Sequence, residues 1–108
     1  MWNPIQQEEQ VRQIAELSHK APQVIFKHST RCSISSVAKN RLEKAGVPTG
    51  VQFHYLDLIA HRPVSNFIAR FFGVNHESPQ VLLIREGRCV YDESHMGISM
   101  DAIEEQLN

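Results

Sequence analysis

The segment V-I-F-K-H-S-T-R-C-S-I-S, residues 24–35, carries the most informative pattern in this chain. A short apolar run stops at polar residues, and after Cys32 apolar residues recur at helical spacing. Unpaired N–H groups and the positive end of the dipole favour a thiolate at a helix start, and the adjacent Arg31 adds positive charge. Ser35 stands three residues after Cys32, giving C-x-x-S, so its hydroxyl can hydrogen-bond the sulfur without forming a disulfide. The segment therefore predicts one-cysteine thiol chemistry.

The composition predicts a small globular protein. With 108 residues, 42% hydrophobic and 21% charged, the chain fits one domain, residues 1–108. A net charge of −1 gives no electrostatic reason to expect nucleic acid or an acidic membrane surface as a partner. We see no signal peptide and no apolar run long enough to span a membrane. Only two cysteines occur, which favours a reducing compartment, and we expect the cytoplasm.

Hydrophobic periodicity and breaker residues predict alternating helices and strands. Helices are expected over 6–19, 33–45, 63–72 and 100–107, and strands over 24–28, 51–57, 80–85 and 88–92. Glu86-Gly87 is the most hairpin-like turn, and Ser99 is a plausible N-cap for the last helix. In the second helix we expect one apolar face, made of Ile34, Val37, Ala38, Leu42 and Ala45.

This order of elements predicts an α/β protein with the thioredoxin-like fold, a mixed four-stranded sheet flanked by helices. The right-handed crossover rule makes the first two strands parallel. Ser78-Pro79 immediately precedes the strand over 80–85, where thioredoxin-like proteins have a cis-proline facing the active-site cysteine. We therefore expect a cis Pro79 opposite Cys32. The plainer interpretation is a trans proline that starts a strand, which is a permitted position.

Four segments together resemble the monothiol bacilliredoxins, the YtxJ-like redox proteins of the bacillithiol system. They are H-S-T-R-C-S-I-S (28–35), R-P-V-S-N (62–66), H-E-S-P-Q (76–80) and S-H (94–95). The family pattern commonly has T-x-C-P-I-S, and Ser33 stands here where that proline would be. This departure removes some preorganisation of the first helical turn but leaves the sulfur and its N–H donors in place.

The resemblance implies a thioredoxin-like fold and the removal of bacillithiol from mixed disulfides on proteins, with Cys32 as the nucleophile. It makes bacillithiol a co-substrate rather than a bound cofactor, and bacillithiolated proteins the partners. Bacillithiol carries a malate with two carboxylates, which basic side chains near Cys32 or Pro79 would meet. Besides Arg31, the expected substrate-binding residues are Lys27, His28, His76, Ser78 and Pro79. For each basic residue, simple solvation of the surface remains an alternative.

Cys89 is expected to be a small sheet residue rather than a resolving cysteine. It lies on the strand returning from the hairpin, and a strand of five or six residues covers roughly 17–20 Å. A disulfide requires Cα atoms within about 7 Å. No metal site is expected, because His28, Cys32 and His76 lack the compact spacing of structural zinc ligands.

Other functions remain open at this stage. A glutaredoxin-like enzyme using glutathione differs only in its substrate. An iron–sulfur carrier of the monothiol glutaredoxin type would use C-G-F-S, whereas this chain has Ser33-Ile34 after the cysteine. A non-catalytic thioredoxin-fold adaptor needs no thiol at the helix start, so Cys32 weighs against it.

Overall fold

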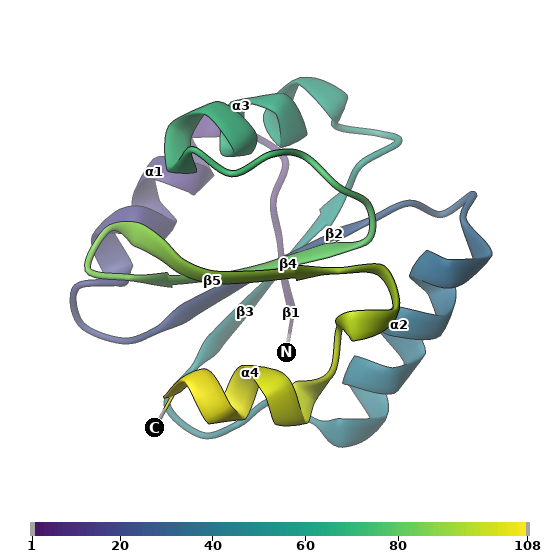
Figure 1. Ribbon diagram of the computed structural model, residues 1–108. Helices are drawn as coiled ribbons and strands as arrows, with labels where there is room; N and C mark the ends of the chain where they lie inside the picture. The colour runs from purple at the N-terminus through teal and green to yellow at the C-terminus, as the bar shows by residue number, and fades with distance from the viewer. Residues whose placement is uncertain (1, 108) are drawn as a thin grey trace.

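The structure, a computed structural model, describes residues 2–107 and has an α/β architecture around one sheet (Figure 1). Its strands are β1 (Trp2–Pro4), β2 (Gln23–His28), β3 (Gln52–Asp57), β4 (Gln80–Arg85) and β5 (Arg88–Ser94). Its helices are α1 (Glu8–Leu17), α2 (Ser33–Ala45), α3 (Arg62–Phe72), the 3₁₀ turn η1 (His95–Gly97) and α4 (Met100–Leu107).

The sheet is mixed and has the strand order β1-β3-β2-β4-β5. Strands β1, β3 and β2 are parallel, as the crossover through α2 requires, and β4 and β5 are antiparallel to their neighbours. Helices α1 and α3 cover one face and α2 and α4 cover the other (Figure 1). The molecule is therefore a three-layer sandwich with the thioredoxin-like plan expected from the sequence.

The core consists of two hydrophobic clusters, one on each face of the sheet. Every residue of β2 is buried, so this central strand supplies both clusters. Val24 and Phe26 pack toward α2 and α4, and Ile25 packs toward α1 and α3. Because side chains alternate along a strand, Lys27 follows Ile25 to the α3 face and His28 follows Phe26 to the α2 face. This alternation separates the two polar residues before the cysteine loop.

Two predicted turns have the expected local geometry. Glu86 and Gly87 have φ angles of 53° and 77°, the positive values that a tight hairpin between β4 and β5 requires. The Ser99 hydroxyl accepts the N–H of Ala102 at 3.1 Å, which makes Ser99 the N-cap of α4.

The prediction of a four-stranded sheet is wrong by one strand, because the sheet has β1 as a fifth strand at its edge. Trp2 and Pro4 pair in register with Phe53 and Tyr55 of β3. This strand has only three residues and includes a proline, so it carries no alternating pattern to detect. An edge position tolerates the proline because one side of an edge strand needs no donors.

The expected apolar face of α2 is also partly wrong. Its buried residues are Ser35, Ala38 and Leu42, spaced by three and four positions. Ile34 and Val37 are instead 42% and 48% exposed, and Ala45 is exposed as well. The helix therefore turns a polar serine toward the sheet. The first helix is shorter than the predicted 6–19, because α1 spans Glu8–Leu17.

Among the described residues, no helix combines the length and the apolar character needed to cross a membrane.

Candidate thiol site at the start of helix α2

Cys32 is the N-cap residue of α2, in an extended conformation with φ −112° and ψ 120°. Its carbonyl accepts the N–H of Ser36 at 3.1 Å, the first bond of the helix, and its own N–H donates to Ser29 at 3.2 Å. The side chain is partly exposed, and the first turn of α2 contains no acidic residue. Cys32 therefore stands at the N-terminus of a 13-residue helix, whose first N–H groups lack partners within the helix, and it remains partly exposed to a substrate.

Ser35 uses its hydrogen bonds within the loop before Cys32. Its Oγ lies 2.6 Å from His28 Nδ1 and accepts the N–H of Ser29 at 3.0 Å. Since Ser35 Oγ accepts that N–H, its hydroxyl proton can be donated to Nδ1 of His28 if the imidazole is neutral. The pKa of His28 is indeed lowered, first by burial and then by the charge of Lys39. The predicted hydrogen bond from Ser35 to the sulfur is thus replaced by one to His28.

The Ser78–Pro79 peptide bond is cis, the isomer expected from the sequence. Gln80, the next residue, pairs with Lys27, so β4 begins at the end of the sheet where β2 finishes. The loop before β4 and the loop before α2 both lie at this end (Figure 1). Pro79 and Cys32 are 47 residues apart in sequence, and the fold brings them to the same end of the sheet.

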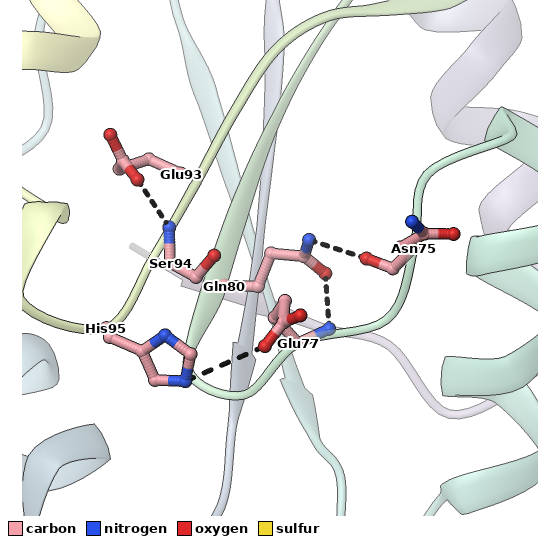
Figure 2. A network of polar contacts seen from close by, with 6 residues as sticks. All are labelled: Asn75, Glu77, Gln80, Glu93, Ser94 and His95. Atoms are coloured by element: carbon pink, nitrogen blue, oxygen red, sulfur yellow. Dashed lines mark hydrogen bonds and ion pairs between the residues drawn. The ribbon is translucent and has the colours of Figure 1, made fainter.

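Side chains around β4 and β5 hold the loop that leads to Pro79 (Figure 2). The buried Gln80 side chain donates to the Asn75 carbonyl at 3.0 Å and accepts the Glu77 N–H at 3.3 Å. His95 contributes from the other side, with Nε2 3.7 Å from a Glu77 carboxylate oxygen and its N–H donated to the Pro79 carbonyl at 3.1 Å. Sequence reasoning gave no role to Gln80 or His95, although both fall in segments that carry the family resemblance.

Lys27 and His76 form a second polar cluster on the α3 face. Lys27 is fully buried, and its Nζ lies 3.2 Å from both the Ser65 carbonyl and His76 Nδ1. Burial lowers the pKa of Lys27 to about 8. The pKa of His76 is lowered by burial first, and then by the charges of Lys27 and Arg62. Ser65 was also missed, because its contact with residue 76 is tertiary.

Exposure divides the predicted site residues into two groups. Arg31 is exposed, and Cys32, His76 and Ser78 are partly exposed, so a substrate can reach these residues. The buried residues are Lys27, His28, Ser35 and Pro79. Ser78 Oγ is itself enclosed and has no hydrogen-bond partner among the described residues. Lys27, His28 and Pro79, all expected to bind substrate, thus lie behind the accessible surface.

Cys89 lies in a different environment from Cys32, and both cysteines are free. Cys89 is opposite Ile84 in the hairpin and packs against the cluster on the α1 and α3 face. Its Sγ donates to the Tyr91 carbonyl at 3.3 Å, and burial is the main cause that raises its pKa to about 11. Cys89 therefore has the surroundings of an inert sheet residue. Within residues 2–107, no three His, Cys, Asp or Glu side chains form a group that could hold a metal ion.

Comparison with known proteins connects this geometry to a family. The family model described as monothiol bacilliredoxin BrxC matches residues 3–103, nearly the whole chain. The chain belongs to the monothiol bacilliredoxin family. The match includes Cys32 at the helix start and Ser35 in the first turn of α2.

Solved structures agree on the fold of this chain. A protein described as having a thioredoxin fold superposes with a TM-score of 0.87 at 25% identity, covering 98% of this chain and 93% of its own. The thioredoxin of Trypanosoma brucei brucei has a TM-score of 0.79 at 15% identity, covering 99% and 91%. The thioredoxin of Malassezia sympodialis has a TM-score of 0.76 at 13% identity, covering 99% and 88%. The family, the fold and the partly exposed N-cap cysteine together support thiol redox chemistry.

Proposed function

We propose that this protein removes bacillithiol from mixed disulfides on client proteins, with Cys32 as its only redox thiol. The observation that supports this most directly is the asymmetry between the two cysteines. Both cysteines are partly exposed, but Cys32 stands at the N-terminus of a 13-residue helix, whereas the Cys89 thiol packs against a hydrophobic cluster, donates a hydrogen bond to a carbonyl and has its pKa raised by burial to about 11. A cycle that needs one protein thiol fits this arrangement.

In the proposed cycle, the Cys32 thiolate attacks the bacillithiol sulfur of the client mixed disulfide. The Cys32–bacillithiol bond forms as the client–bacillithiol bond breaks, and the client cysteine leaves as a thiolate that takes up a proton from water. A second bacillithiol thiolate then attacks the bacillithiol sulfur on Cys32. That step produces bacillithiol disulfide and restores the Cys32 thiolate, so no second protein thiol is used. The cycle requires a reducing pool of this thiol, and we place it in the cytoplasm.

The accessible residues at this end of the sheet are the proposed contacts for bacillithiol. Arg31 and His76 are available for its carboxylates, and Ser78 is partly exposed beside the buried cis Pro79, which shapes the loop before β4. Ser78 is partly exposed although its hydroxyl is enclosed, so its proposed contact with the substrate is through the exposed atoms of the residue. His28 is 4% exposed and stacks against Phe26, with ring centroids 5.9 Å apart, so its proposed role is to hold the loop through Ser35.

Intact-mass analysis tests the thiol preference. The reduced protein is incubated separately with bacillithiol disulfide and glutathione disulfide, and the adduct is located by peptide mapping. We expect one bacillithiol on Cys32, formed faster than the glutathione adduct, and none on Cys89. A faster glutathione adduct would contradict the proposed substrate.

Reduction of a bacillithiolated model protein tests the monothiol cycle. Cys32→Ser should abolish the reaction, because serine cannot form the sulfur intermediate, while Cys89→Ala should keep near-normal turnover. An internal disulfide between the two cysteines in the oxidised protein, or loss of activity in Cys89→Ala, would contradict the proposal.

A further inference from the structure

Lys27 is a fully buried ammonium whose contacts are all to neutral groups. Its Nζ bonds the Ser65 carbonyl and His76 Nδ1, each at 3.2 Å, and it has no ion pair with a carboxylate among the described residues. Buried charges in proteins are ordinarily paired with an opposite charge, because desolvation without such a partner is costly. Because Lys27 lacks such a partner, we look for a role of this residue other than stabilising the fold.

We propose that Lys27 is a positioning residue that acts through His76, holding this imidazole neutral with its proton on Nε2 so that it donates a hydrogen bond to the substrate. This inference rests on the proposed function for the identity of the substrate, a low-molecular-weight thiol that carries carboxylates. The charge state and tautomer of the imidazole do not depend on the proposed function, because they follow from the contacts within the protein.

The tautomer follows from the donor inventory. An ammonium has three donors and no acceptor, so an Nδ1 that bonds Lys27 Nζ must carry a lone pair and no proton. The Ser65 hydroxyl, 3.3 Å from the same Nδ1, is a second group able to donate to it. A neutral imidazole with a bare Nδ1 has its proton on Nε2.

The neutral charge state follows from the surroundings of His76. Burial is the main cause that disfavours the imidazolium and lowers the pKa of His76, followed by the charges of Lys27 on β2 and Arg62 on α3. Glu77 in the same loop opposes them more weakly. Glu77 is also 3.7 Å from His95 of η1, so its carboxylate is shared with a second histidine. His76 is therefore kept as a donor of one N–H rather than as a cation.

The position of His76 makes this donor useful. Lys27 itself cannot touch a substrate because it is fully buried, whereas His76 is partly exposed and precedes Pro79 by three residues. Lys27 thus connects the end of β2 and the first turn of α3 to the loop that carries Ser78 and Pro79. Through that connection, one buried side chain sets both the proton position and the placement of the loop opposite Cys32.

The wild-type protein provides the first test, without any assay of activity. Long-range ¹H–¹⁵N NMR of the histidine side chains at neutral pH identifies which ring nitrogen of His76 is protonated. The proposal expects a proton on Nε2 only. A His76 protonated on Nδ1, or on both nitrogens, would overturn it.

Variants test the role of Lys27. Lys27→Met has a similar shape without the charge, and we expect His76 to lose its single tautomer and to become protonated at a higher pH than in the wild type. The KM for a bacillithiolated model protein should rise about tenfold while kcat changes little, as expected when one hydrogen bond to a charged group is lost. Lys20→Met, an exposed lysine outside the site, is the control for charge. An unchanged tautomer and KM in Lys27→Met would overturn the proposal.

Replacing His76 separates the donor from the rest of the ring. Gln places an amide N–H near the position of Nε2, so His76→Gln should keep most of the affinity that His76→Leu loses. Equal KM values for these two variants would contradict the donor role. If bacillithiolated proteins are not substrates at all, the proposed function fails, but the wild-type NMR result still decides the state of His76.

Discussion

The hydroxyl of Ser35 lies 2.6 Å from Nδ1 of His28, at the position where a two-cysteine redox site would have its second sulfur. The same oxygen accepts the N–H of Ser29 at 3.0 Å. Ser35 is completely buried and His28 nearly so. The serine therefore closes the turn between β2 and α2, and the loop that presents Cys32 depends on it.

Ser35→Ala should destabilise the protein by about 1–3 kcal/mol, because it leaves a buried imidazole nitrogen and a backbone N–H without their partner. Urea denaturation measures this as a lower midpoint with an unchanged slope. The adjacent Ser36 is exposed, so Ser36→Ala is the matched control and should leave the midpoint in place. Equal urea midpoints for the two variants would show that the contact between Ser35 and His28 contributes nothing to the stability of the protein.

The two cysteines should differ in their reaction with iodoacetamide at neutral pH. Since the pKa of Cys89 is raised to about 11, only about one molecule in ten thousand has this sulfur as a thiolate at pH 7. Cys32 is partly exposed at a helix N-terminus and should be labelled first. Peptide mapping at short times measures the ratio, and comparable labelling of both residues in the folded protein would contradict this account.

Acid should destabilise the fold through His54. This residue is buried on β3, its Nε2 is 2.7 Å from Gln23 Oε1, and burial lowers its pKa from 6.5 to about 4. The unfolded chain therefore takes up a proton below pH 6.5 that the folded chain does not accept until about pH 4. Stability should fall by about 3 kcal/mol as the pH decreases through this window.

Denaturation curves collected between pH 4 and 6.5 measure this loss. His54→Gln removes the titrating group and should flatten the pH dependence, whereas His19→Gln, at an exposed position, should not. A pH dependence that survives in His54→Gln would assign the acid sensitivity to other residues.

Alkali should have the opposite effect through Lys27. Burial lowers the pKa of Lys27 from 10.5 to about 8, so between these values the unfolded chain holds a proton that the folded chain has released. Stability from this group should therefore increase by about 3 kcal/mol as the pH rises from 8 to 10.5. The difference in unfolding free energy between the wild type and Lys27→Met isolates the contribution, and a difference independent of pH would contradict it.

The fold was predictable because its main signals are local. The apolar run of β2, the helical spacing after Cys32 and the turn residues Glu86 and Gly87 each lie within a few positions, and short-range sterics act at that distance. The crossover rule then leaves one handedness for the connection between the first two long strands. Strand β1 was missed because three residues carry no period, and only their pairing with β3 makes them a strand.

The residue types at the thiol site were also evident from the sequence, whereas their roles were not. Cys32 and Ser35 occupy one helical turn, so their spacing alone predicts a single redox sulfur. The partners of the neighbouring polar residues come from distant segments: Lys27 bonds residues 38 and 49 positions away. Which of these side chains is buried, and which nitrogen of His76 remains free to donate, depends on how α3 and the Pro79 loop pack over β2. Local patterns specify chemistry along the chain, but burial and hydrogen-bond partners arise only when the segments pack together.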